Sequence, residues 1–168
     1  MKISAQEEYG LRCLVQLANL SENESRTLPQ IAELEGISVA NAGKLMWLLN
    51  RAGFVQATRG TKGGYSLARP AGEIRLNEVI KVLDEDVLNK HCESYTGVLD
   101  TCVQKGDCGI RPVIVGLHEI VDNALSQITL AQLVGTESAV IEMFHQIKGI
   151  NRTIDVHKHT GTDILVNN

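Results

Sequence analysis

The chain has 168 residues, 43% of them hydrophobic but only 4% aromatic, and a net charge of −4. This length suits one domain with an appendage, built around an aliphatic core. No run approaches the roughly 18 apolar residues that a membrane span needs, and Glu7 and Glu8 stand where a signal peptide would place its apolar segment. We therefore expect a cytoplasmic protein with no membrane partner, in which clustered thiols stay reduced.

The basic residues are concentrated in one part of the chain. Between Gly36 and Gly72 there are five bases and no acid, whereas from Ala71 to the end there are 8 bases and 14 acids. The local charge of a surface, rather than the total charge, makes an electrostatic footprint on DNA. The distribution therefore indicates that the first part of the chain contacts DNA although the whole chain is acidic.

Capping signals predict three helices in the first 72 residues. Ser4 and Thr27 each stand three residues before a Glu or Gln, which is the pattern of a capping box, and Ser38 is a third candidate cap. Gly36 and Gly53 suit the ends of the second and third helices. We expect these helices over residues 5–20, 27–36 and 39–52.

A glycine-rich basic turn, residues 59–64, joins two predicted strands over residues 54–58 and 65–67. Three helices followed by a hairpin make a winged helix-turn-helix, in which the third helix is the candidate DNA reader. The predicted fold class is thus mainly α with a small β-hairpin, and residues 1–72 form the predicted DNA-binding domain.

Three polar residues near the start of the third helix, Ser38, Asn41 and Lys44, lie away from its predicted apolar stripe. They could reach base edges or phosphates in the major groove, and the alternative is a solvated helix face. Trp47 is compatible either with the core or with a contact to the DNA backbone. The predicted stripe consists of Ile37, Leu45, Leu48, Leu49 and Ala52.

Three of the four cysteines, Cys92, Cys102 and Cys108, fall in a polar, glycine-bearing stretch over residues 89–111. Such a long loop without secondary structure of its own is usually functional or disordered, and three thiols favour a function. The spacings lack the Cys-x-x-Cys pairs typical of structural zinc. An iron–sulfur cluster is therefore the preferred interpretation, with zinc or no metal as the alternatives. Cys13 lies among apolar residues and is expected in the core.

After the cysteine loop, apolar residues recur at helical spacing and predict a long helix over residues 112–128. A lone helix with such a face needs a partner, and we expect the same helix of a second chain, which gives a homodimer. A dimer would present two reading helices to two half-sites of double-stranded operator DNA. Residues 73–135 thus form a predicted cluster-binding and dimerisation region, and residues 136–168 a C-terminal extension that is partly disordered. Shorter helices are expected near residues 77–83 and 137–147.

Several segments carry a family resemblance: Met1 to Ser4, Ile31 to Ser38, Leu45 to Val55, Arg59 to Ala68 and Ile128 to Ala131. Together with the three cysteines, they resemble the iron–sulfur winged-helix regulators that include IscR, NsrR and RirA. The resemblance covers about residues 1–135. It implies that Cys92, Cys102 and Cys108 ligate a 2Fe–2S or 4Fe–4S cluster.

The fourth cluster ligand is where this chain departs from the pattern. Regulators like IscR place a histidine three residues after the last cysteine, and Arg111 stands there in this chain. Those like NsrR use an acid from the first helix of the partner subunit, and Glu8 occupies that position. Glu8 is therefore the preferred fourth ligand, and its alternative role is that of a first-turn acid that stabilises the helix dipole. The other candidate ligands are Glu7, His91 and His118.

The resemblance also implies that Arg59 enters a narrow minor groove, and Lys62 is expected to contact phosphate. The expected function is a transcription regulator, a repressor, whose operator affinity is set by a cluster that senses redox state, nitric oxide or iron supply. The alternatives are a thiol-based or zinc-binding regulator without a cluster, or an iron–sulfur electron- or cluster-transfer protein. The sequence contains no nucleophile–base arrangement and no phosphate loop that would indicate an enzyme.

Overall fold

The computed structural model describes residues 3–21, 24–58, 60, 63–83, 98, 102–104 and 107–146. The chain divides into two compact units, Met1–Val134 and Gly135–Asn168. The sites discussed below belong to the first unit. Cys92, His91, Arg59, Lys62 and residues 147–168 lie outside the described residues.

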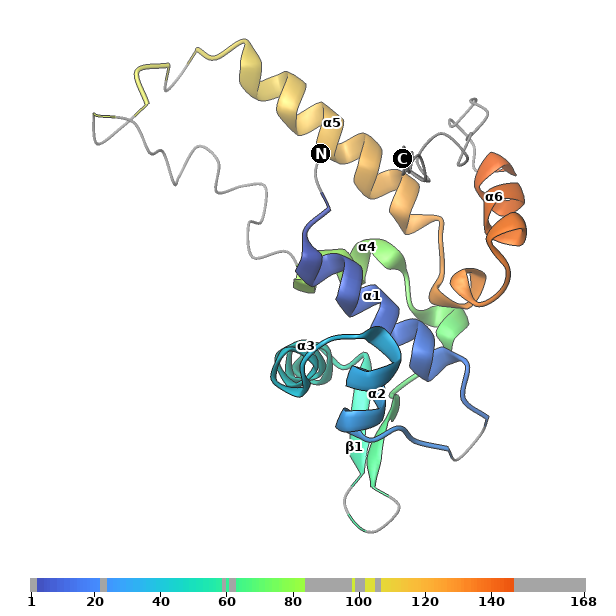
Figure 1. Ribbon diagram of the computed structural model, residues 1–168. Helices are drawn as coiled ribbons and strands as arrows, with labels where there is room; N and C mark the ends of the chain where they lie inside the picture. Colours follow the sequence, from blue (N-terminus) through green and yellow to red (C-terminus); the bar gives the residue numbers. More distant parts are fainter. Residues whose placement is uncertain are drawn as a thin grey trace, which may run out of the picture. The chain divides into compact units, whose positions relative to one another are not determined.

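The first unit is mainly helical with one two-stranded antiparallel sheet, as the sequence predicts. In Figure 1, α2 and α3 lie beside the hairpin and α4 lies next to α1. The elements of the described residues are α1 (Ala5–Ala18), α2 (Leu28–Glu35), α3 (Val39–Arg51), β1 (Val55–Thr58), β2 (Gly64–Leu67), η1 (Ala71–Glu73), α4 (Leu76–Leu83), α5 (Ile110–Ser126), η3 (Leu130–Leu133) and α6 (Glu137–Gln146).

The helix caps confirm the predicted starts of the first three helices, whereas α1 ends at Ala18, two residues before its predicted end. The Ser4 amide donates to Glu7 Oε2 at 2.6 Å, and the Ser4 hydroxyl accepts from the Glu7 amide, which completes a capping box. Gly36 ends α2 with φ of 64°, a left-handed conformation that glycine adopts at little cost. These local hydrogen bonds satisfy backbone groups that a helix end leaves without a partner in the helix.

The core of the first unit is aliphatic and lies between α1, α3, α4 and the hairpin. Helix α3 buries Ala42, Leu45, Met46 and Leu49, whereas Ala52, which the predicted stripe included, is exposed. Ala52 is the C-terminal cap, so the chain turns away from the helix at that point. Leu48 is only half-buried. Met46, which the predicted stripe did not include, is buried instead.

Cys13 is part of this core, as predicted, and its side chain has no exposed surface. Burial is the main reason that the pKa of its thiol rises from 9.0 to about 12, and the nearby charge of Glu35 raises it further. A thiol in this setting stays protonated at neutral pH. It behaves as a small apolar side chain rather than as a metal ligand.

The hairpin is built by strict pairing of β1 with β2, from Val55 opposite Leu67 to Thr58 opposite Gly64. The segment before α2 adds a further bridge, in which the Tyr65 amide donates to the Arg26 carbonyl at 2.7 Å. Gly64 is required at this crossing, because a Cβ atom there would lie 2.7 Å from the Arg26 carbonyl oxygen. The hairpin is thus fixed to the entry of α2 as well as to α3.

Helix α5 is joined to the helix-turn-helix through α4. The Leu76 amide donates to the Ile128 carbonyl at 3.0 Å, and the Leu130 amide donates to the Ile74 carbonyl at 2.9 Å. Helix α4 in turn contacts α1 so closely that a Cβ atom on Gly10 would lie 2.4 Å from Leu83 Cδ1. The α4 segment therefore connects α5 to the helices that carry the candidate reading face.

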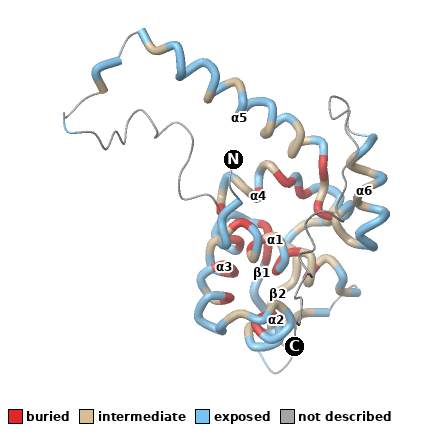
Figure 2. Tube along the Cα trace, turned by 45° about the horizontal axis from the view of Figure 1, so that its top comes forward, coloured by how far each residue is buried: buried red, intermediate tan, exposed pale blue. Residues whose placement is uncertain are grey.

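Helix α5 itself buries no residue, and Figure 2 shows buried positions concentrated instead in the helices and strands before it. Ile110, Val113, Leu117 and Ile120 recur at three- and four-residue intervals and are between 59% and 69% exposed. They define a continuous apolar stripe, which we call the α5 stripe. Among the helices of the described residues, none combines the length and the apolarity that a membrane crossing requires.

Candidate nucleic-acid interface and metal-binding segment

The start of α3 presents the three polar residues that the sequence singled out. Ser38, Asn41 and Lys44 are all exposed. The Ser38 hydroxyl accepts from the Asn41 amide at 3.2 Å and thereby caps the helix. This capping bond uses the hydroxyl as an acceptor, so its hydrogen can still be donated to another group. The structure brings these residues together at one end of an exposed helix.

Further along α3, the structure shows where Trp47 lies, which sequence reasoning left open. Its side chain is 56% exposed, and the Arg51 guanidinium stacks over the indole ring at 5.4 Å from the ring centroid. Ala40, Lys44, Trp47 and Arg51 follow one another at helical spacing on the side opposite the buried residues. The exposed face of α3 is therefore longer than the polar cluster at its start.

In the sequence, Arg59 and Lys62 stand between β1 and β2, and both lie outside the described residues. Below the tip, the Gln56 side chain donates to the Ser66 hydroxyl at 3.2 Å across the two strands. The Gly63 amide donates to the Gly60 carbonyl at 2.8 Å, which closes the turn. The two strands that flank this segment are thus firmly paired.

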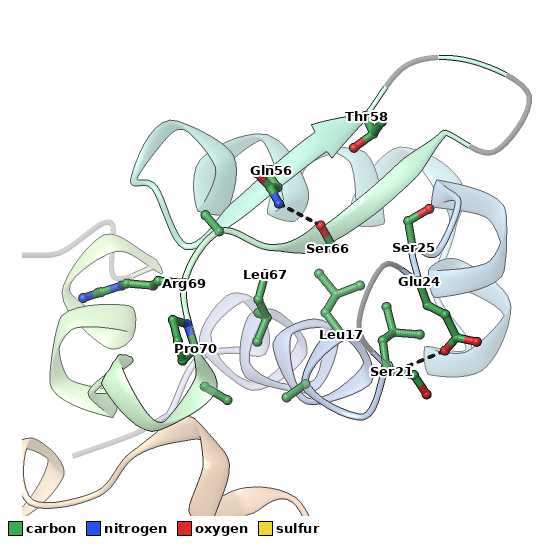
Figure 3. Close-up of a pocket in the computed structure, with 14 residues that line it drawn as sticks. Leu17, Ser21, Glu24, Ser25, Gln56, Thr58, Ser66, Leu67, Arg69 and Pro70 are labelled. Atoms are coloured by element: carbon green, nitrogen blue, oxygen red, sulfur yellow. Dashed lines mark hydrogen bonds between the residues drawn. The ribbon is translucent and has the colours of Figure 1, made fainter.

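A groove of about 620 Å³ lies between this hairpin, the end of α1 and the segment that follows β2. Figure 3 shows hydroxyls and amides on its walls, with Leu17 and Leu67 between them. Its two charged residues are already engaged, because Glu24 accepts from the Ser21 amide and Arg69 is paired with Glu78. Among the described residues that line the groove there is no cysteine or histidine, so neither Cys102 nor Cys108 borders it.

Two of the three clustered cysteines are described, and both are half-buried free thiols. Cys108 stands two residues before Ile110, where α5 begins, and Cys102 directly precedes a turn at residues 103–104. The described residues contain no group of three metal-ligating side chains, but Cys92 is not among them. The two thiols are reduced, soft donors on one short segment, which fits iron–sulfur or zinc coordination.

The candidates for a fourth ligand differ in how they are engaged. Glu7 is buried and its carboxylate belongs to the capping box. Glu8 is half-exposed and pairs with Arg12 one turn later. Its side chain also borders an open apolar groove of about 550 Å³ along α1 and α2. His118 is half-buried on α5.

The fold and the exposed face of α3 define a winged helix-turn-helix protein in which a long helix, α5, follows the hairpin and α4. The chain matches the Rrf2 family, described as iron-dependent transcriptional regulators, over residues 3–136. It is also 30% identical over 154 residues to the HTH-type transcriptional regulator IscR of Serratia proteamaculans (strain 568), covering 91% of each chain. The chain therefore belongs to the Rrf2 family of transcription regulators, as the resemblance in the sequence suggested.

Solved structures give the same assignment. T. potens IscR aligns with a TM-score of 0.60 and 28% identity, covering 79% of this chain and 85% of that one. The oxidized form of Staphylococcus aureus CymR aligns with a TM-score of 0.63 and 26% identity, covering 81% of this chain and 98% of that one. The winged-helix fold is thus shared with regulators of both names.

Proposed function

We propose that this chain is a homodimeric repressor whose affinity for double-stranded operator DNA is set by an iron–sulfur cluster. The observation that carries the proposal is the placement of Cys102 and Cys108. Cys108 stands two residues and Cys102 eight residues before α5 in the sequence, and the apolar stripe of that helix is exposed to solvent. A cluster site would then adjoin, in the sequence, the helix that makes the dimer contact.

The DNA-binding surface in this proposal is the exposed start of α3 together with the hairpin tip. Ser38, Asn41 and Lys44 supply donors and acceptors for base edges and phosphates. Arg59 would enter the minor groove and Lys62 would contact a phosphate. Support comes from the acid-free stretch between Gly36 and Gly72 and from the membership of the chain in a family of transcription regulators.

The cluster ligands would be Cys92, Cys102 and Cys108, with Glu8 of the partner subunit as the fourth. Glu8 is favoured over Glu7 because the Glu7 carboxylate is buried and already bonded to the Ser4 amide. Because Cys13 is fully buried with its thiol pKa at about 12, it is not available as a ligand. A bound cluster would supply a centre whose oxidation or loss changes which segments are held together.

The connection from α5 to the reading helix runs through residues that the structure describes. Asp122 on α5 accepts from Lys81 Nζ at 2.7 Å, and Asn77 contributes a longer contact to the same carboxylate. Helix α4, which carries Lys81 and Asn77, contacts both α1 and α3. A change at the start of α5 would thus alter the relative placement of the two reading helices of a dimer, which is a coupling between two sites.

The proposal is tested by anaerobic purification and by operator selection from a random pool of duplexes. We expect brown protein with bound iron and sulfide, and a selected duplex whose affinity differs between cluster-loaded and stripped protein. Protein that stays colourless after reconstitution, or equal affinity of both forms for the same duplex, would reject the cluster as the sensor.

Two substitutions sharpen this test. Cys102→Ala should abolish iron binding while circular dichroism shows an unchanged fold, whereas Cys13→Ala should retain iron because that thiol lies in the core. Arg59→Ala should weaken binding to the selected duplex, and unchanged binding would remove Arg59 from the reading surface.

A second candidate is a thiol-based regulator without a cluster. It is favoured by the half-buried free thiols of Cys102 and Cys108 and by the similarity to an oxidized form of CymR. In that case metal-free protein would form a reversible Cys102–Cys108 disulfide on mild oxidation, with loss of two protons and two electrons to the oxidant. Operator affinity would then follow the disulfide content measured by mass spectrometry, without any iron.

A further inference from the structure

Trp47 is the only tryptophan of the chain, and it lies on the outside of the molecule rather than in its core. More than half of its side chain is exposed, at 56%. Arg51, one helical turn later, holds its guanidinium over the indole ring at 5.4 Å from the centroid. An exposed aromatic ring that carries a stacked cation presents a flat, positively charged surface to solvent.

This pair occupies a particular side of α3. The buried residues of the helix are Ala42, Leu45, Met46 and Leu49. Trp47 and Arg51 continue, in helical register, the exposed line that begins with Ala40 and Lys44. The sequence from Gly36 to Gly72 contains no acid that would oppose a polyanion on this side. The pair therefore extends the proposed DNA-binding face toward the C-terminal end of the reading helix.

We propose that Trp47 and Arg51 form a clamp for the DNA sugar–phosphate backbone, an inference that rests on the proposed DNA-binding function. In a helix-turn-helix the N-terminal residues of the reading helix contact base edges, so its C-terminal part is left to face the backbone. A guanidinium that lies over an aromatic ring still has N–H donors, in the fork that matches a phosphate. The indole N–H is a second donor.

The role assigned to the clamp is positioning rather than sequence reading. Phosphate contacts fix the register and orientation of a protein on the duplex but carry no base information. The clamp should thus strengthen binding to every duplex by a similar factor. This distinguishes it from Ser38 and Asn41, whose loss should affect some sequences more than others.

Because the chain has a single tryptophan, its fluorescence reports on the clamp directly. Anaerobically isolated protein is titrated with a mixed-sequence duplex at low salt, where sequence-independent binding is strong, and then with the selected operator. Quenching of Trp47 by acrylamide, a neutral quencher, is measured at each point. We expect the quenching constant to fall several-fold when either duplex is bound. Full quenching in a complex that a mobility shift shows to be formed would overturn the clamp.

The charge contribution is measured by substitution. Arg51→Ala should reduce the slope of log Kobs against log salt by about 0.9, the value for one lost phosphate contact. Arg51→Lys should keep the slope but bind less tightly, because lysine lacks the bidentate fork. Arg75→Ala is the matched control, since Arg75 is an exposed arginine just before α4 and its loss removes the same charge elsewhere.

If Arg51→Ala and Arg75→Ala have equal slopes, or if Arg51→Ala lowers only the melting temperature, the Trp47–Arg51 pair merely stabilises the helix and the inference is wrong.

The outcome of this test is separable from that of the proposed function. A pool that yields no operator, or an operator insensitive to the cluster, would leave protection of Trp47 by mixed-sequence DNA unchanged. Conversely, a cluster-dependent operator bound with Trp47 fully accessible would reject the clamp alone.

Discussion

The winged helix-turn-helix and helix α5 are both rich in apolar residues, but they use them in opposite ways. In the first region, Leu14, Ile31, Met46 and Leu49 have no exposed surface. In α5, no residue is buried and the stripe from Ile110 to Ile120 faces solvent. One region completes its core within a single chain, whereas the other has an apolar face that only a further surface can cover.

This difference separates two kinds of stability. The core around α1 and α3 should unfold with a free energy that does not depend on protein concentration. The contribution of α5 should appear only when its stripe is covered, so it should depend on concentration if a second copy provides the cover. Substitutions can therefore perturb the two regions independently.

The largest effect is expected in the core of the winged helix-turn-helix. Leu49→Ala would remove a fully buried side chain from α3 and leave a cavity, which costs about 2–5 kcal/mol of unfolding free energy. Chemical denaturation measures this loss directly. Leu34→Ala is the control because Leu34 is a half-exposed leucine of the neighbouring helix α2. Equal losses for both variants would show that the core is not organised as described.

A substitution in the α5 stripe should instead break the proposed dimer. Leu117→Glu would place a charge in the stripe in both copies, and each would lose about 1.5–3 kcal/mol of apolar burial. The dimer dissociation constant should thus rise about 100-fold or more, as measured by analytical ultracentrifugation.

Val115→Glu is the matched control for that experiment, since Val115 is also exposed on α5 but does not share the spacing of the stripe. If Val115→Glu dissociates the dimer as strongly as Leu117→Glu, the interface does not follow the stripe. Circular dichroism confirms that each variant keeps its helices.

The buried thiol of Cys13 in the winged helix-turn-helix should make the free energy of unfolding depend on pH. The pKa of Cys13 is about 12 in the folded protein against 9.0 for an ordinary thiol, so between these values the unfolded chain releases a proton that the folded chain keeps. Stability should therefore fall as pH rises through this window, by up to about 1.4 kcal/mol per pH unit. Cys13→Ala should lose this part of the slope when its unfolding free energy is measured over the same range. An identical slope in both proteins would show that Cys13 ionises freely.

The smallest effect is expected at the junction of the two regions. The hydrogen bond from Lys81 is the main reason that the pKa of the Asp122 carboxyl lies below its usual value of 3.8. The stability that this interaction contributes is therefore present above pH 3.8 and is lost as the pH falls further. The pair is exposed, so Asp122→Asn should cost less than about 1 kcal/mol at neutral pH. Asp107→Asn, an exposed acid before α5, is the control. A larger loss specific to Asp122 would show that α4 and α5 are joined more rigidly than an exposed ion pair allows.

Local signals predicted most of the elements. Helix α5 begins at Ile110, two residues before the predicted start at Pro112, because proline is tolerated in the first turn of a helix. The capping boxes at Ser4, Thr27 and Thr129 are formed by residues three positions apart. The helical spacing of the α5 stripe could be recognised from the sequence for the same reason, although what covers it stays a prediction.

The sequence was less informative wherever the answer depended on distant residues. Periodicity placed Ala52 in the stripe of α3 and left Trp47 undecided, because a helix can be rotated slightly without changing its pattern. Packing against α1 and α4 settled the rotation, which exposes Trp47 and buries Met46, whereas Ala52 is exposed because it is the C-terminal cap, where the chain leaves the helix. Arg51 could then be recognised as the partner of Trp47.

The sequence alone determined the caps, the hairpin, the cysteine segment and the membership in a regulator family, because each depends on residues that are neighbours along the chain. Only the tertiary structure decided which side of α3 faces outward and that residues 74–76 pair with residues 128–130. It also decided that Gly10 lies against Leu83. These features depend on which segments meet in the packed core, and that choice is made by the burial of side chains far apart in the sequence.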